Sequence, residues 1–202
     1  MVWKHEASWW NIGILLTTKH NSQAKKTNKH RPDGRRSIRL PGYDYSQEGA
    51  YVITIVVKDR ACRFGNIVGN AVELNTVGMI VQEEWEKTKI IRPNVDLDTF
   101  VVMPIHVHGI IILNESGRGT SRRAPTVERF GKPTSNSIPT IVRLFKSVST
   151  KRINEICNTP GVPVWQRNYY EHIIRDDDAL NNVREYILNN PTQWALDKEN
   201  PF

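Results

Sequence analysis

The chain has 202 residues, of which 39% are hydrophobic and 24% are charged, and its formal net charge is +7 at pH 7. This length and composition are typical of one ordinary globular domain with room for an appendage. No apolar run approaches the roughly 18 residues that a membrane span needs. The two cysteines, Cys62 and Cys157, form neither a CxxC motif nor a disulfide framework. These features exclude a membrane-spanning protein and a disulfide-stabilised secreted domain, and we expect a cytoplasmic protein.

The positive charge is concentrated in the first part of the chain. Residues 1–42 contain nine Lys/Arg and two Asp/Glu, a balance of +7, whereas residues 43–202 contain nineteen of each, a balance of zero. A basic arm on a neutral body is typical of nucleic-acid binding, although a solvated tail would have the same composition. We expect residues 1–36 to form a flexible basic extension and residues 37–202 to form the functional domain.

Runs of β-branched and aromatic residues predict four main strands and one short hairpin. The strands fall at residues 50–58, 95–102, 105–113 and 169–174. Gly65 and Gly69 predict the hairpin within residues 62–74, and Met103–Pro104 makes the tight connection of an antiparallel pair.

Three stretches place apolar residues at helical spacing and predict helices. They are residues 75–87, 137–153 and 176–190. Asn75 and Asp176 are suitable N-caps, and Pro191 should end the last helix because proline does not continue one.

Residues 114–136 are rich in Gly, Ser, Thr, Arg and Pro, which predicts a mobile loop. Its five Lys/Arg either touch a phosphate backbone or belong to a plain connection. Sequential hairpins with interspersed helices predict an α+β fold, with a mostly antiparallel central sheet and helices packed on it.

Two histidines lie two residues apart in the strand predicted at 105–113. Alternate side chains of a strand point to the same face, so His106 and His108 point toward one place, as a metal-binding pair would. Buried imidazoles need polar partners, and one metal ion would satisfy both, although hydrogen bonds near a sheet end would also do so. Gly109, which has no side chain, leaves room for the close approach of a ligand.

Tyr186 and Asn190 lie four residues apart in the helix predicted at 176–190, so they share one face. By itself, such a tyrosine is more often a core residue with its hydroxyl at the surface, and such an asparagine is more often a helix cap. Beside a histidine pair, Asn190 can give an amide oxygen to a cation, and Tyr186 then lies one helical turn from that cation.

These residue types suit metal-assisted phosphoryl transfer. A divalent ion neutralises a phosphodiester oxygen, and two neutral imidazoles with one amide leave the ion its full charge. Mixed nitrogen and oxygen ligands fit Mn²⁺ well and Mg²⁺ acceptably. Because the pKa of a tyrosine phenol is about 10, a phosphotyrosine bond retains the energy that is needed to rejoin DNA.

Further candidates for DNA contact lie in two segments. Residues 165–172 interleave aromatics with Arg and Gln, which suits single-stranded nucleic acid, although the same aromatics can complete a core at a strand edge. We expect a mixture, with Trp165 and one tyrosine inside and Arg167 toward the ligand. Cations also lie along the helix predicted at 137–153, where a solvated face explains them equally well. The predicted DNA-binding residues are Arg36, Arg39, Arg143, Lys146, Lys151, Arg152, Trp165, Gln166, Arg167 and Tyr169.

Four motifs occur in a fixed order along the chain. They are Arg-Ser-Ile-Arg-Leu-Pro-Gly-Tyr-Asp-Tyr-Ser (36–46), Val-Val-Met-Pro-Ile-His-Val-His-Gly-Ile-Ile (101–111), Trp-Gln-Arg-Asn-Tyr-Tyr-Glu-His-Ile-Ile-Arg (165–175) and Tyr-Ile-Leu-Asn-Asn-Pro (186–191). In these motifs and their order, residues 36–202 resemble the single-tyrosine HUH transposases, and more closely the branch of REP-associated tyrosine transposases. The resemblance implies an HUH endonuclease fold of ferredoxin-like (RRM-like) topology.

The resemblance also implies an activity and the residues that carry it. His106 and His108 would be the metal-binding pair, Asn190 would complete the metal shell, and Tyr186 would be the nucleophile that leaves a 5′-phosphotyrosine and a free 3′-OH. The cofactor would be Mg²⁺ or Mn²⁺. The substrate would be single-stranded DNA near a hairpin, as in repetitive extragenic palindromes, and the enzyme would be a nucleoid-associated monomer or homodimer without a membrane partner.

The chain departs from the family pattern in places. Ile105 stands where the family usually has Asn, and alternation puts it on the face opposite the histidines. Tyr169 and Tyr170 are rival nucleophiles by spacing alone, and the resemblance selects Tyr186. Two other functions remain open: a domesticated protein that binds DNA hairpins without cutting them, and a metal-dependent hydrolase that uses water as its nucleophile.

Overall fold

A computed structural model of the chain describes residues 40, 43–114 and 136–196. All of them belong to one unit, residues 38–202. The extension predicted at 1–36 and nearly all of the loop predicted at 114–136 lie outside the described residues.

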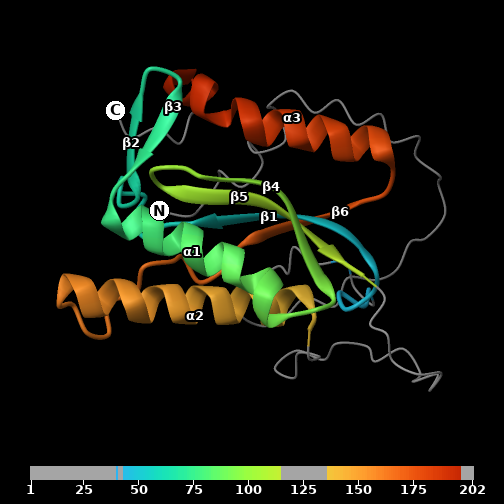
Figure 1. Cartoon of the computed structure of the whole chain (residues 1–202), viewed down its shortest axis with the longest axis horizontal. Helices are drawn as coiled ribbons and strands as arrows, with labels where there is room; N and C mark the ends of the chain where they lie inside the picture. Colours follow the sequence, from blue (N-terminus) through green and yellow to red (C-terminus); the bar gives the residue numbers. More distant parts are fainter. Residues whose placement is uncertain (1–39, 41–42, 115–135, 197–202) are drawn as a thin grey trace, which may run out of the picture. The chain divides into compact units, whose positions relative to one another are not determined.

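A four-stranded antiparallel sheet forms the centre of the fold (Figure 1). Its strands are β1 (Gly49–Val56), β4 (Val95–Val102), β5 (His106–Leu113) and β6 (Tyr170–Ile174). The spatial order is β4-β5-β1-β6, and each neighbouring pair is antiparallel. With one helix after β1 and one after β5, this is the β-α-β-β-α-β arrangement of ferredoxin-like domains. The predicted α+β fold, its antiparallel sheet and its topology are confirmed.

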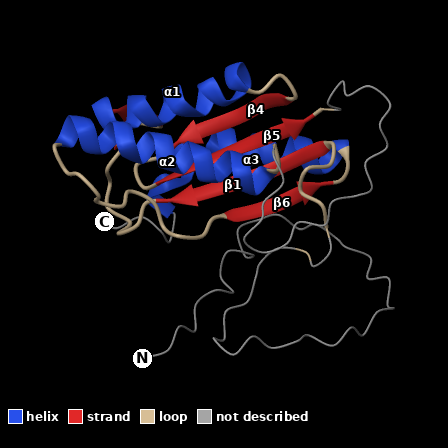
Figure 2. Cartoon of the chain, turned by 90° about the horizontal axis from the view of Figure 1, so that it is seen from below, coloured by secondary structure: helices blue, strands red, loops and turns tan. Residues whose placement is uncertain are grey.

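Helices cover both faces of the sheet (Figures 1 and 2). Helices α1 (Thr76–Ile91) and α2 (Ile138–Cys157) pack on one face, and α3 (Asp177–Gln193) packs on the other. Alternation along β5 separates the two faces: Val107 and Ile111 join the α1–α2 cluster, whereas Ile110 joins the α3 cluster. His106 and His108 share the parity of Ile110, so they lie on the face that α3 covers.

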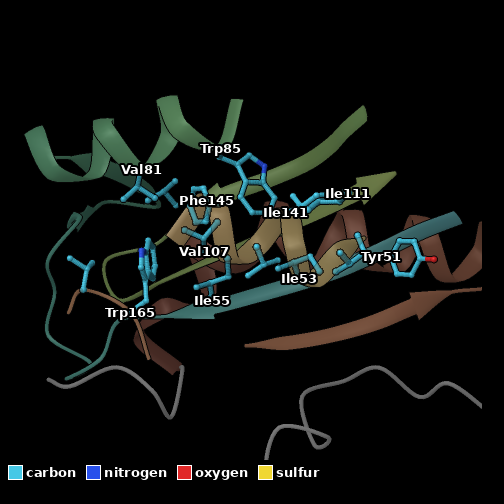
Figure 3. Packing of buried hydrophobic residues seen from close by; sticks show 14 of the residues in the cluster. Tyr51, Ile53, Ile55, Val81, Trp85, Val107, Ile111, Ile141, Phe145 and Trp165 are labelled. Atoms are coloured by element: carbon cyan, nitrogen blue, oxygen red, sulfur yellow. The ribbon is translucent and has the colours of Figure 1, made fainter. Parts of the chain in front are cut away.

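Aromatic rings fill the larger core between the sheet and helices α1 and α2 (Figure 3). The ring of Phe145 lies 5.3 Å from that of Trp85, edge to face, and 5.6 Å from that of Trp165. Strand β1 contributes alternate, fully buried residues to the sheet side of this core: Tyr51, Ile53 and Ile55. This core joins one face of the sheet to helices α1 and α2, and α3 packs on the other face.

The short hairpin is present as predicted. Strands β2 (Gly65–Val68) and β3 (Ala71–Leu74) pair around the turn at Gly69, whose φ of +62° is the left-handed conformation that such a turn requires. Ile67 and Val72 of the hairpin pack beside the buried residues Met103, Ile105 and Trp194.

Two predicted details at this end of the fold are wrong. Ile105 lies in the turn before β5 begins, so strand alternation does not reach it, and it packs in the cluster that contains Trp194. Pro191 does not end α3, which continues to Gln193 and a 3-10 turn at Trp194–Leu196. Pro191 removes one helical hydrogen bond near the helix end, and burial of Trp194, which is 7% exposed, compensates for this loss.

The first helix is capped as predicted but runs further. The Asn75 side chain accepts a hydrogen bond from the Gly78 backbone N–H at 2.9 Å. The helix continues one turn beyond its predicted end at Lys87, to Ile91.

Gly109 makes room for a ring of the core, not for a ligand as its position beside the histidines suggested. A Cβ atom at Gly109 would lie 2.4 Å from Cζ2 of Trp85. We therefore expect Gly109→Ala to lower the free energy of unfolding by about 1–3 kcal/mol, because the buried indole must shift. Urea denaturation measures this change.

A double-mutant cycle provides the control. Phenylalanine lacks the second ring of the indole and therefore lacks the Cζ2 atom. Gly109→Ala should thus lower the free energy of unfolding clearly less in a Trp85→Phe background. Equal costs in both backgrounds would show that Trp85 is not the reason for the glycine.

Candidate active site

The two histidines of β5 lie side by side beneath α3. Their rings are 4.4 Å apart between centroids and inclined at 66°, and His106 and His108 are 2% and 4% exposed. Burial of two imidazoles in a sheet that is otherwise apolar requires polar partners. The partners come from β1 and α3.

Thr54 of β1 is the polar neighbour of His108. The two residues are paired in register, and the Thr54 hydroxyl lies 2.8 Å from Nδ1 of His108. In the tautomer that binds metal, the Nδ1–H group donates to the Thr54 oxygen and Nε2 keeps its lone pair. Thr54 was not among the site residues predicted from the sequence. Its signal was present, since Thr54 is the one hydroxyl in the apolar run Val-Ile-Thr-Ile-Val-Val.

The protonation state of His108 suits a metal ligand. Burial, and to a smaller degree the charge of His106, hold the pKa of His108 well below its usual value of 6.5. The ring is therefore neutral at neutral pH, and only neutral imidazole has a lone pair for a cation.

Helix α3 brings Tyr186 and Asn190 to the histidines. The amide oxygen Oδ1 of Asn190, which is 6% exposed, lies 3.3 Å from Nε2 of His106. The Tyr186 ring lies 5.4 Å from the His108 ring, edge to face, and is partly buried. Residues more than 75 positions apart in the chain thus converge on one place, as the sequence analysis predicted for these four side chains.

The donor atoms fit a hard or borderline divalent ion. The described residues contain no group of three or more His, Cys, Asp or Glu that could hold a metal. A metal ion at this place would be held by the predicted set, two imidazole nitrogens and the amide oxygen of Asn190. Such a neutral set matches Mn²⁺ and, with added water, Mg²⁺.

An ion pair fixes α3 on the sheet. A β-bulge in β4 puts Asp98 and Thr99 opposite the single residue Ile110, and Asp98 then faces α3. The Arg184 guanidinium of α3 donates through Nε to Asp98 Oδ1 at 3.0 Å and through a terminal nitrogen to Oδ2 at 2.6 Å. Arg184 precedes Tyr186 by two residues. This two-point ion pair therefore fixes the part of α3 that carries the Tyr186 phenol.

The ion pair predicts a pH-dependent contribution to stability. The hydrogen bonds from Arg184 lower the pKa of Asp98 from 3.8 to about 2. A carboxyl group with a lowered folded-state pKa stabilises the fold above its unfolded pKa, and this stabilisation is lost as the pH falls toward about 2. We expect Asp98→Asn to lower Tm by a few degrees at pH 7 and by progressively less below pH 4, as thermal unfolding would show. A difference in Tm that is constant with pH would contradict this role.

Two of the predicted DNA-binding aromatics belong to the core. Trp165 is 5% exposed, and its indole Nε1–H donates to the Ser149 hydroxyl at 2.9 Å. Tyr169 packs against the same cluster, and its hydroxyl donates to Glu171 at 2.6 Å. The expectation that Trp165 and one tyrosine lie inside is thus confirmed. The burial of Trp165 leaves no ring face for a base, whereas Tyr169 is half-buried on the α1–α2 side of the sheet and its predicted contact with DNA stays a prediction.

The predicted cations of α2 lie on the face opposite the histidines. Arg152 pairs with Glu83 and Glu84 of α1, which joins the two helices. The Lys146 ammonium donates to three successive backbone carbonyls, and its burial lowers its pKa to about 8. Lys151 lies 3.9 Å from Glu155, and Arg143 is exposed. The structure therefore does not bring these four residues to Tyr186.

The other predicted DNA-binding residues lie near the edge of the sheet or outside the described range. Gln166 is half-buried and Arg167 is exposed, in the segment that leads into β6. Arg36 and Arg39 lie outside the described residues. No helix in the described part of the chain is long and apolar enough to cross a membrane.

Known proteins are similar to this chain in sequence or in fold. The chain is 41% identical over 188 residues to an uncharacterized protein of Haemophilus influenzae, and the alignment covers 91% of this chain and 98% of that protein. No protein-family model matches the chain. Among solved structures, the fold is similar to that of a REP-associated tyrosine transposase bound to a REP hairpin. The TM-score is 0.50 and the identity 20%, over 81% of this chain and 75% of that one. This likeness confirms the resemblance at the level of the fold.

Proposed function

Because the chain belongs to one family with the Haemophilus influenzae protein and shares the fold of a REP-associated tyrosine transposase, we propose that it is a transposase that cuts and joins single-stranded DNA. The proposed chemistry is nucleophilic attack by Tyr186 with the help of a divalent cation. The alternative that it only binds DNA hairpins is an outcome of the test below.

One observation carries this proposal. The Tyr186 ring lies 5.4 Å from the ring of His108, His108 is paired with His106, and His106 contacts Asn190, all beneath one helix. A tyrosine that only completed a core would not need two buried imidazoles and a buried amide beside it. The arrangement supports a role for the Tyr186 phenol toward a phosphate that these groups would hold.

The residues of this chain would act as follows. The Tyr186 oxygen attacks the phosphorus atom, the bond from phosphorus to the 3′ oxygen breaks, and the leaving 3′ oxygen takes up a proton. The 5′ phosphate remains esterified to Tyr186 until a 3′-OH attacks it and restores the phenol. Mg²⁺ or Mn²⁺ bound by His106, His108 and Asn190 would neutralise the phosphate charge. Thr54 orients His108, and the Arg184–Asp98 pair positions the helix that carries the nucleophile.

The proposed substrate is single-stranded DNA next to a hairpin. The structural relative was solved with a REP hairpin, and the site described above has neutral ligands that leave a cation free to attract a phosphate. The proposal allows a monomer or a homodimer, since all four site residues come from one chain.

Denaturing electrophoresis of the full chain with 5′- or 3′-labelled hairpin DNA and Mn²⁺ tests the proposal. A covalent band that contains the strand 3′ of the cut, and that disappears with a chelator, is the expected result. Cleavage without a covalent band would indicate a hydrolase that uses water. Binding without cleavage, across a set of hairpins with flanking single strands, would indicate the domesticated binding protein.

A further inference from the structure

The edge strand β6 exposes an aromatic ring beside the candidate active site. Tyr170 is 38% exposed and is the one aromatic among the exposed large hydrophobic side chains of the described residues. Burial raises the pKa of the Tyr170 phenol, so this side chain is partly buried and partly open to contact in the described part of the chain. Such rings on basic surfaces are typical stacking platforms for the bases of single strands.

Strand register puts Tyr170 on the same face as the histidines. Thr54 pairs with His108 on one side and with Tyr170 on the other, so these three side chains form one row across β5, β1 and β6. Two strand spacings amount to about 10 Å, so Tyr170 is within reach of a nucleotide close to the reacting phosphate. Tyr169, the neighbour predicted to bind DNA, has the opposite parity and packs, partly buried, against the α1–α2 cluster.

Among the described residues, the apolar cluster beneath α3 does not extend to Tyr170. Its buried residues Val183 and Ile187 pack with Val52 and Ile110, and at β6 with Ile174. Tyr170 is outside that cluster, at the opposite end of β6 from Ile174. In the described part of the chain, the end of β6 that carries Tyr170 therefore lies beyond the apolar contacts of α3.

An exposed cation precedes Tyr170 by three residues, in the segment that leads into β6. Arg167 is exposed, and no ion pair among the described residues includes it. The Lys146 ammonium donates to the carbonyls of residues 166, 167 and 168 at 2.6, 3.2 and 3.3 Å, which fixes the backbone of this segment. The register shows that this segment contains extra residues relative to β1. Trp165 pairs with Val57 and Tyr170 with Thr54, so five steps along one strand oppose three along the other.

We propose that Tyr170 and Arg167 form a subsite for the single strand that flanks the reacting phosphate, with a base stacked on the Tyr170 ring and a backbone phosphate bound by Arg167. This inference rests on the proposed function, because it assumes that the single strand reaches the histidine face of the sheet. The proposal assigns base stacking to Tyr170, whereas the sequence had suggested Trp165 and Tyr169.

Binding without catalysis tests this subsite. The probe is an oligothymidylate of about 12 nucleotides with one 2-aminopurine and a fluorescein label, titrated with the full chain in the presence of a chelator. We expect Tyr170→Leu to weaken binding by about 5- to 100-fold and to abolish the quenching of 2-aminopurine by stacking. Tyr170→Phe, which keeps the ring, should retain both the affinity and the quenching. Unchanged binding and quenching in Tyr170→Leu, or no binding by the unmodified chain, would overturn the proposal.

A second measurement does not depend on how well Tyr170→Leu folds. Arg167→Gln should reduce the slope of log K against log salt by about 1, because one phosphate contact is lost. Arg143→Gln is the matched control on α2, behind the sheet, and should leave the slope unchanged. Equal effects of the two variants would place the DNA elsewhere and overturn the subsite. Since no cleavage is needed, failure of the subsite and failure of the proposed covalent chemistry are distinguishable.

Discussion

Replacement of Tyr186 by phenylalanine should abolish the covalent protein–DNA band and reduce strand cleavage by about 10³-fold or more, because the attacking oxygen is gone. The phenylalanine ring can keep the edge-to-face contact with His108, whose ring lies 5.4 Å away. Helix α3 remains attached through Arg184 and Asp98. We therefore expect the variant to fold and to bind hairpin DNA nearly as tightly as the unmodified chain. Denaturing electrophoresis and anisotropy measure the two properties.

Tyr170→Phe is the matched control for this experiment. It removes a phenol from the same face of the sheet, and the covalent band should persist because the nucleophile is still present. A covalent band in Tyr186→Phe that is lost in Tyr170→Phe would reverse the assignment. Cleavage that survives in both variants would indicate attack by water.

Removal of an imidazole should have the second large effect. His108→Ala and His106→Ala each take one of the two nitrogen ligands away, and we expect Mn²⁺ binding to fall by at least about 100-fold. Titration calorimetry, or the electron paramagnetic resonance signal of free Mn²⁺, measures the affinity without DNA. Metal-dependent cleavage should be lost in parallel.

Thr54→Val should have a smaller effect of the same kind. It preserves the shape of the side chain and removes the oxygen that lies 2.8 Å from Nδ1 of His108. The expected loss of Mn²⁺ affinity is about 10- to 100-fold, smaller than that from loss of a ligand. His172→Ala is the matched control, since His172 lies on the same face of the sheet but on β6. An equal loss in His172→Ala would mean that the ion is bound elsewhere.

Much of the fold could be predicted because its signals are local. The β-branched runs gave the strands within one or two residues, and period-two alternation correctly put His106 and His108 on one face of β5. The end of α3 was mispredicted because a local rule about Pro191 competes with burial of Trp194 against residues 90 positions earlier in the chain. That contact depends on the tertiary fold and has no local signal.

The site was predictable only in part. Tyr186 and Asn190 share a helix face by spacing, but their approach to the histidines depends on which face of the sheet α3 covers. Thr54 was missed for a similar reason, because its partner is set by register between strands that are 54 positions apart. The cations of α2 were assigned to DNA from their positions along one predicted helix, and these positions do not tell which side of a sheet the helix occupies.

One helix carries both the phenol of Tyr186 and the amide of Asn190, one turn apart. A displacement of α3 that transports a covalently attached strand would therefore also withdraw an oxygen ligand from the cation. By thermodynamic linkage, ion occupancy and docking of the helix must strengthen each other by the same factor. The bound ion would then stabilise the docked position of α3 in addition to neutralising charge. Dissociation of the ion would favour movement of α3 together with the covalently attached strand.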